Sequence, residues 1–307
     1  MTVTPTADDD SGAVAVGGTL TVPAVSGLLA NDHGTSLTVT GASTPGHGTV
    51  TVQPDGAWTY VPDAGWSGTD TFTYVVTDGT TTLTRTVTVT VTPTAADDAV
   101  QAPPGAATTV PASRGLLAND AGDLTVTSYT QPGRGTVVVD PSGGYVYTPP
   151  DGWSGRTTFT YTARDGAGHT VTRTATVTVS PVGVDDEYRT PTGGGTTVPA
   201  ERGLLANDDG ALTVVRHTQP AQGSVVVAPD GSFTFTPPRG WTGTTTFTYT
   251  ASDGVTEVTR TVTVTVERAA GAHLADTGAR ADVWLVLAAA FLVTGAALVA
   301  LRRRGPA

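Results

Sequence analysis

Valine and threonine alternate with a period of two in three stretches of the chain, at 84–92, 171–179 and 258–266. Successive side chains of a strand point to opposite faces, so each stretch predicts a strand with Val in a core and Thr facing water. Shorter alternating runs flank three turn sequences, in which Pro presets φ and Gly accepts a positive φ. These predicted hairpin tips are 54–56, 141–143 and 229–231. The pattern indicates an all-β chain of short antiparallel strands.

Three sequence markers recur in the same order and divide the chain into repeats. Gly27-Leu28-Leu29-Ala30-Asn31-Asp32 returns unchanged at 115–120 and 203–208, a spacing of 88 residues. Gly-Trp-Ser/Thr-Gly, followed by a Phe-x-Tyr strand, stands at 65–68, 152–155 and 240–243, and Asp-Gly follows at 78, 165 and 253. The repeats therefore span about 1–92, 93–180 and 181–268. Around seven strands in each repeat is the pattern of a β-sandwich.

These markers resemble the tandem Ig-like or cadherin-like repeats of bacterial surface proteins. The resemblance is carried by the opening pair Asp97-Asp98, the Gly-Leu-Leu-Ala-Asn-Asp segment, the hairpin at 132–137 and the strand at 230–237. It implies three Ig-like/cadherin-like β-sandwich repeats. Such repeats serve as stalks, spacers and adhesive units alike, so the ligand stays open.

The amino-acid composition argues against several classes of function. The net charge is −11 and all 16 basic residues are Arg, which argues against a nucleic-acid binder with a clustered basic surface. Without Cys there are no disulfides, thiolate metal sites or Cys nucleophiles. Without Lys, the Lys–Asn isopeptide bonds of many Gram-positive adhesins cannot form, and the Lys used in pilus polymerisation is missing. The five His fall at non-equivalent repeat positions and no catalytic motif is present, so we do not expect an enzyme.

The C-terminal part departs from the repeat pattern. After a short linker at 269–273, residues 283–301 form an uncharged stretch rich in Ala, Leu and Val. As a helix these 19 residues would measure about 28 Å, enough to cross a bilayer core. Three Arg at 302–304 follow directly, which predicts a cytoplasmic C-terminus and repeats outside the cell.

Just before this predicted transmembrane helix lies Leu274-Ala275-Asp276-Thr277-Gly278. The segment 274–307 resembles the cell-wall sorting signal of Gram-positive bacteria, whose motif is LPxTG. Ala275 makes it the LAxTG variant associated with class E sortases of actinobacteria, and the lack of Lys fits a high-GC genome. The resemblance implies that a sortase cleaves between Thr277 and Gly278 and joins Thr277 to peptidoglycan. An unprocessed single-pass membrane protein with an incidental LADTG is the alternative.

The N-terminus of the given sequence resembles the middle of a repeat boundary. Met1 to Ala7 aligns with Val89 to Ala95, so Met1 stands at a Val position. A GTG codon encodes Val internally and Met when it is read as a start. We therefore expect the gene to begin upstream with a signal peptide, and the number of repeats in the whole protein stays open.

Acidic residues recur at equivalent places and are candidate calcium ligands. Ca²⁺ takes about six to eight oxygen ligands, and loops at one end of a sandwich could supply them. Asn-Asp and Asp-Gly are also ordinary turn formers, so a purely structural role stays open. The candidates in the second and third repeats are Asp97, Asp98, Asp120, Asp165, Asp185, Asp186, Asp208 and Asp253.

The tryptophan residues of the second marker are also candidates for stacking against a carbohydrate. Trp66, Trp153 and Trp241 stand at a fixed place before the Phe-x-Tyr strand, which favours packing against their own repeat. Phe72 and Tyr74 are expected half in the core and half at its rim.

Overall fold

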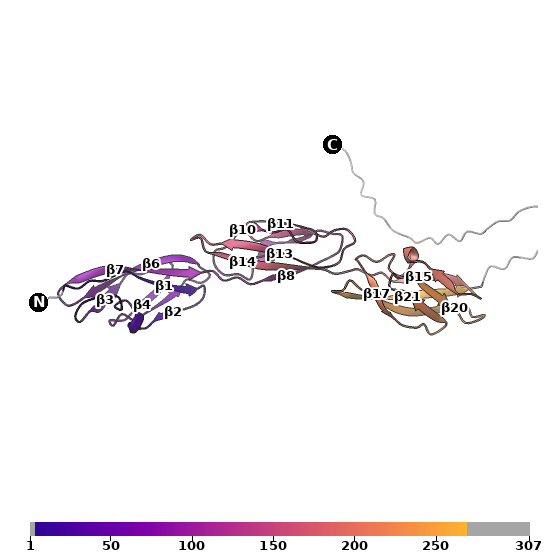
Figure 1. Ribbon diagram of the computed structural model, residues 1–307, viewed down its shortest axis with the longest axis horizontal. Helices are drawn as coiled ribbons and strands as arrows, with labels where there is room; N and C mark the ends of the chain where they lie inside the picture. The colour runs from indigo at the N-terminus through magenta and orange to yellow at the C-terminus, as the bar shows by residue number, and fades with distance from the viewer. Residues whose placement is uncertain (1–3, 269–307) are drawn as a thin grey trace, which may run out of the picture. The chain divides into compact units, whose positions relative to one another are not determined.

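A computed structural model describes residues 4–268, which form three repeats of seven strands and one short 3-10 helix each (Figure 1). The first repeat contains β1 (Asp10–Ala15), β2 (Leu20–Val22), η1 (Ala24–Ser26), β3 (Thr38–Ala42), β4 (Gly48–Val52), β5 (Trp58–Pro62), β6 (Gly68–Thr77) and β7 (Thr82–Thr92). The predicted linker, sorting motif and transmembrane helix lie outside the described residues.

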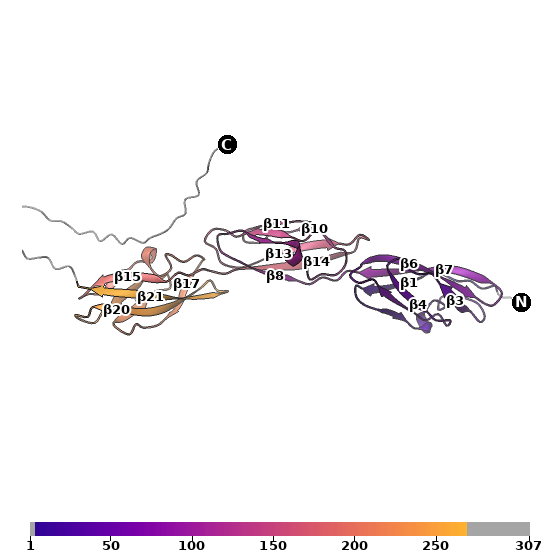
Figure 2. The same cartoon turned by 180° about the vertical axis from the view of Figure 1, so that it is seen from behind.

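The second and third repeats follow the same order of elements, seen from behind in Figure 2. The second contains β8 (Asp98–Ala102), β9 (Thr108–Val110), η2 (Ala112–Arg114), β10 (Thr125–Tyr129), β11 (Thr136–Val139), β12 (Tyr145–Thr148), β13 (Gly155–Arg164) and β14 (Thr170–Val179). The third contains β15 (Asp186–Pro191), β16 (Thr196–Val198), η3 (Ala200–Arg202), β17 (Thr213–His217), β18 (Ser224–Val227), β19 (Phe233–Thr236), β20 (Gly243–Ser252) and β21 (Glu257–Glu267).

Each repeat is a sandwich of a four-stranded and a three-stranded sheet. In the first repeat the strand orders are β1-β7-β6-β3 and β2-β5-β4, and the other repeats have equivalent orders. Most neighbours are antiparallel, as predicted, but the first and last strands of every repeat pair in parallel: β1 with β7, β8 with β14, and β15 with β21. The prediction of antiparallel strands throughout is wrong here because alternation shows which face a residue occupies and not which strand lies beside it.

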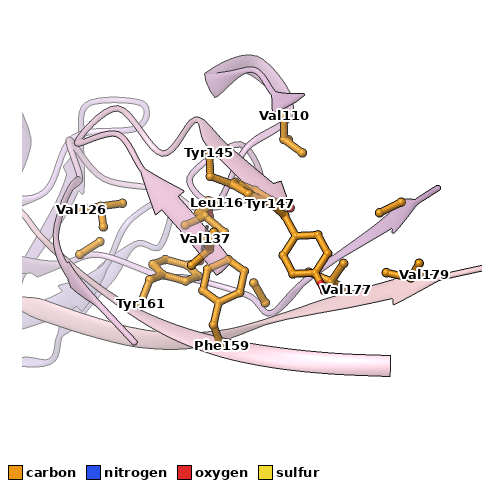
Figure 3. Close-up of a cluster of buried hydrophobic side chains, with 13 residues drawn as sticks. Val110, Leu116, Val126, Val137, Tyr145, Tyr147, Phe159, Tyr161, Val177 and Val179 are labelled. Atoms are coloured by element: carbon orange, nitrogen blue, oxygen red, sulfur yellow. Dashed lines mark hydrogen bonds between the residues drawn. The ribbon is translucent and has the colours of Figure 1, made fainter. Parts of the chain in front are cut away.

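The Val/Thr alternation places side chains as expected. Val87, Val89 and Val91 of β7 are fully buried, whereas the intervening Thr residues are only partly buried. In the second repeat, aromatic side chains of β12 and β13 meet the Val side chains of β14 between the two sheets (Figure 3). Each repeat has its own cluster of buried side chains. The predicted all-β architecture of three sandwich repeats is therefore confirmed.

The recurring Gly-Leu-Leu segment is fixed by contact with the hairpin tip. The Leu116 N–H donates to the Gly143 carbonyl at 2.9 Å, and a Cβ at Gly115 would lie only 2.2 Å from that oxygen. The same close approach recurs between Gly27 and Gly56 and between Gly203 and Gly231. A side chain at this Gly would thus collide with backbone, which explains the residue type at the head of the segment.

The expectation that Phe72 and Tyr74 are half in the core and half at its rim is wrong. Phe72 is 2% exposed and Tyr74 is fully buried. Residues two apart on a strand share one face, so both side chains enter the sandwich. The Tyr74 hydroxyl is satisfied inside by donating to the Leu28 carbonyl at 3.0 Å.

Candidate functional site

Two aspartates and one tyrosine come together where each repeat begins. The second Asp of the opening pair begins the first strand, and the Asp that ends the Gly-Leu-Leu-Ala-Asn-Asp segment lies in the loop after the 3-10 helix. We call these two residues the acid pair of the repeat. The Tyr comes from the long strand β6, β13 or β20. The three sites are Asp10/Asp32 with Tyr74, Asp98/Asp120 with Tyr161, and Asp186/Asp208 with Tyr249.

The first Asp of each opening pair has a structural task. The Asp97 carboxylate accepts the Thr174 N–H at 2.9 Å, and the Asp97 carbonyl accepts the Asn119 side-chain amide at 3.3 Å. Asp9 and Asp185 make the same contacts in their repeats. This residue therefore ties the start of the repeat to its closing strand and to the Asn-Asp loop.

The Asp of the loop is also held by hydrogen bonds. Asp120 Oδ1 accepts the Ala96 N–H at 2.9 Å, and Asp120 Oδ2 lies 3.1 Å from the Tyr161 hydroxyl. In the third repeat the Tyr249 hydroxyl donates to Asp208 Oδ2 at 2.8 Å. One oxygen of each loop Asp is thus taken by backbone, and in these two repeats the other faces a tyrosine hydroxyl.

The second Asp of the opening pair is the unusual group. In all three repeats its Oδ2 is buried and has no hydrogen-bond partner among the described residues: Asp10, Asp98 and Asp186. Asp186 as a whole is only 5% exposed. Desolvation by burial, together with the charge of the other Asp of the pair, raises the pKa of Asp10 and Asp98 to about 6 and that of Asp186 to about 7.

Asp165 and Asp253, which were predicted together with the acid pairs, hold turns instead. Asp165 Oδ1 accepts the N–H groups of Ala167 and His169, and its Oδ2 lies 2.8 Å from His169 Nδ1. Asp253 accepts the N–H groups of Val255 and Thr256. Neither residue shares a hydrogen bond with the acid pair of its repeat.

Asp165 also receives a hydrogen bond from the preceding repeat. The Ser67 hydroxyl donates to Asp165 Oδ2 at 3.0 Å, and Ser67 is 5% exposed. Together with His169 and backbone N–H groups, this contact lowers the pKa of the Asp165 carboxyl, although burial alone would raise it. Sequence reasoning missed this contact; the recurrence of a hydroxyl residue between Trp and Gly in the second marker was its only signal.

The second marker places a tryptophan against its own repeat. Trp153 and Trp241 pack on the cores of their repeats, and Trp66 stacks on His47 with ring centroids 4.3 Å apart. The Gly that ends the marker makes room for the indole, because a Cβ at Gly155 would lie 3.2 Å from Trp153. The prediction that these Trp residues pack against their own repeat is confirmed.

The acid pairs do not fit calcium. Within residues 4–268 no group of three or more His, Asp or Glu side chains is placed to hold a metal ion. Each site offers two carboxylates and one phenol, and one carboxylate oxygen of the loop Asp already accepts a backbone N–H. Ca²⁺ needs about six to eight oxygens at roughly 2.3–2.6 Å.

Comparison with known proteins agrees with the architecture. A family model described as bacterial cadherin-like domain matches residues 3–93 and 179–268, more than half of the chain, and a bacterial Ig domain model matches residues 91–180. No curated protein is significantly similar to the chain. In the part of the chain that the structure describes, no helix has the length and hydropathy needed to cross a membrane.

Three solved structures illustrate the similarity, all at low identity. A titin I-band fragment of three domains is 13% identical, with 86% of this chain and 98% of that chain covered and a TM-score of 0.31. The first four extracellular domains of Drosophila N-cadherin are 14% identical, covering 85% and 74%, with a TM-score of 0.25. Domains 21 to 23 of human CDH23 are 14% identical, covering 74% and 88%, with a TM-score of 0.27.

Proposed function

Since this chain belongs to the bacterial cadherin-like domain family, we propose that it is an extracellular surface protein whose repeats act as a stalk or spacer fixed to the cell wall. Domains of this kind are non-enzymatic structural modules. The work of a spacer is to hold its two ends apart, which requires stable modules and defined connections between them.

The observation that carries this proposal is the contact at each connection between repeats. Ser67 is buried and bonded to Asp165 of the second repeat, and a Cβ at Gly122 would lie 2.7 Å from Ser67 Oγ. Ser154 is equally buried, and a Cβ at Gly210 would lie 2.8 Å from its hydroxyl. Thr242, the equivalent residue of the last repeat, is exposed. The same loop thus closes against the following repeat twice.

The sequence supports covalent anchoring at the C-terminal end of the stalk. In the proposed reaction the residues at 283–301 and the Arg tail hold the exported chain at the membrane. A sortase thiolate attacks the Thr277 carbonyl, the bond to Gly278 breaks, and the tail leaves with a free amine. The amine of a peptidoglycan precursor then displaces the thiolate and forms an amide with Thr277. In this chemistry the chain is a substrate of the sortase.

Mass spectrometry of muramidase-released wall material tests the anchoring. We expect a C-terminal peptide that ends at Thr277 and carries the mass of a peptidoglycan stem. A chain found only in the membrane fraction with Arg302 to Arg304 intact would show an unprocessed single-pass membrane protein. The variant Thr277→Ala should move the protein from the wall to the membrane fraction. The matched control Thr82→Ala, at an exposed threonine of β7 outside the motif, should leave it in the wall.

An adhesin that binds a partner directly is the second candidate. It is favoured by an exposed apolar pair on the outer face of the second repeat, where Val138 of β11 lies opposite Val146 of β12. These side chains are 67% and 37% exposed. If they bind a partner, the double variant Val138→Thr and Val146→Thr should reduce adhesion of cells that display the protein while its amount in the wall stays constant. Unchanged adhesion would favour the spacer.

A further inference from the structure

The acid pairs contain a buried polar atom that neither wall anchoring nor the role of a spacer explains. The same atom, Oδ2 of the second opening Asp, is buried without a hydrogen-bond partner among the described residues in all three repeats. An unpaired buried charge destabilises a fold, so we expect the charge to be compensated in each of the three repeats. Either a cation neutralises the pair or a proton does.

The geometry disfavours a cation. Oδ1 of the loop Asp is occupied by the N–H of Asp8, Ala96 or Val184, and the first opening Asp accepts the N–H of the closing strand. The side-chain oxygens left at each site are those of the acid pair and the tyrosine hydroxyl, and the Leu carbonyl beside them already accepts this hydroxyl, so the site offers fewer oxygens than calcium requires.

A proton suits the site better. Two carboxylates that share a buried site cannot both ionise without repulsion, so one of them takes up a proton. The tyrosine hydroxyl bonds to the loop Asp, at 3.1 Å in the second repeat and 2.8 Å in the third, and thereby stabilises the ionised form of that residue. In these two repeats the second opening Asp, with its free and buried Oδ2, is left as the protonated partner, whereas in the first repeat Asp32 Oδ2 is buried without a partner as well, so Asp10 and Asp32 share the proton.

We propose that each acid pair holds one proton in place of a calcium ion, and that mild acid therefore stabilises the repeats. Asp186 is the strongest case because it is more than nine-tenths buried. The charged and titratable groups that face the acid pairs are Asp8, Asp9, His33, Tyr74 and Arg85 in the first repeat, Asp97, Tyr145, Tyr161 and Arg173 in the second, and Asp185, Tyr188, Tyr249 and Arg260 in the third.

The sign of the pH dependence follows from the raised pKa values. A carboxyl whose pKa is higher in the folded chain than in the unfolded chain binds its proton more tightly when folded. The ionised form of such a carboxyl destabilises the folded chain. This effect is absent below the pKa of the unfolded chain, about 4, and complete above the pKa of the folded chain. Stability should therefore fall as the pH rises from there through about 6 for Asp10 and Asp98 and through about 7 for Asp186.

Thermal unfolding of residues 1–268, a compact unit with a core in each repeat, tests the proposal. We expect a lower Tm at about pH 8 than at about pH 5, and no change in Tm when calcium replaces EDTA. The triple variant Asp10→Asn, Asp98→Asn and Asp186→Asn, which imitates the protonated form, should raise the Tm at the higher pH and flatten the pH dependence. The control triple variant Asp63→Asn, Asp140→Asn and Asp151→Asn, at exposed aspartates that do not face the acid pairs, should keep the slope of the wild-type chain.

A direct titration keeps the proposal testable if a variant does not fold. Carboxyl ¹³C resonances of Asp10, Asp98 and Asp186 in the unaltered chain should have midpoints at about pH 6, 6 and 7. Midpoints at the ordinary value of about 4 would overturn the proposal. A rise in Tm with calcium that disappears in the first triple variant would overturn it as well, in favour of a metal site.

Discussion

Removing the Tyr161 hydroxyl tests how much the buried polar site contributes to a single repeat. This hydroxyl lies 2.7 Å from the Leu116 carbonyl and 3.1 Å from Asp120 Oδ2, and Tyr161 is fully buried. Tyr161→Phe keeps the ring in the core but leaves both acceptors without this donor. An unsatisfied buried acceptor costs about 1–3 kcal/mol, so we expect a loss of about 2 kcal/mol, in the middle of this range because the Leu116 carbonyl is buried whereas Asp120 is partly exposed. For a domain of this size the Tm falls by about 10 °C.

Hydrogen exchange with mass spectrometry is the suitable assay, because it assigns the loss of stability to one repeat. Peptides from β13 and β14 should exchange faster in Tyr161→Phe, whereas peptides of the first and third repeats, each with its own core, should be unchanged. Tyr129→Phe is the matched control, since Tyr129 is 38% exposed. A change in Tm of less than about 2 °C would refute the argument that the single O–H shared by these two acceptors stabilises the repeat.

Contacts at three other places can be tested in the same way. Gly115→Ala should destabilise the second repeat by about 3 kcal/mol because its Cβ would overlap the Gly143 carbonyl, while Gly133→Ala, with open space around it, should be neutral; urea unfolding compares them. Ser67→Ala should loosen the connection between the first two repeats without unfolding either, seen as a change in NMR residual dipolar couplings; unchanged couplings would contradict the role given to Ser67. The Asp70 carboxylate accepts hydrogen bonds from Tyr60 and from backbone N–H groups, which lower its pKa although burial alone would raise it. The ionised Asp70 therefore stabilises the first repeat above about pH 4, and this contribution is lost as the pH falls further. Asp70→Asn should remove this acid sensitivity of the first repeat, which thermal melts at several pH values would measure.

The sequence alone predicts features that depend on local order along the chain. Val87, Val89 and Val91 alternate with Thr, and a strand with one buried face is the outcome that this pattern requires. The hairpin tips follow from the turn preferences of Pro and Gly. Three copies of each marker make the division into repeats visible without knowledge of any contact.

Contacts between residues far apart in the chain were harder to predict from the sequence. The parallel pairing of β1 with β7 joins residues at opposite ends of a repeat, and alternation carries no information on neighbouring strands. The acidic residues could be found from the sequence, but their separation into acid pairs and turn residues depends on which backbone N–H groups reach each carboxylate. The tyrosine that completes each pair was expected partly at the rim of the core, although its hydroxyl needs a partner once it is buried.

The parallel pairing also determines how a repeat responds to force. The first strand enters at the N-terminal end of the repeat and the last strand leaves at its C-terminal end, so tension between the two ends pulls these neighbours in opposite directions along their length. The hydrogen bonds between them are then loaded together in shear, and many must break at once before the repeat extends. The register contains six residue pairs in the first and third repeats and five in the second. In a chain held at one end and pulled at the other, the middle repeat is therefore the one expected to yield first.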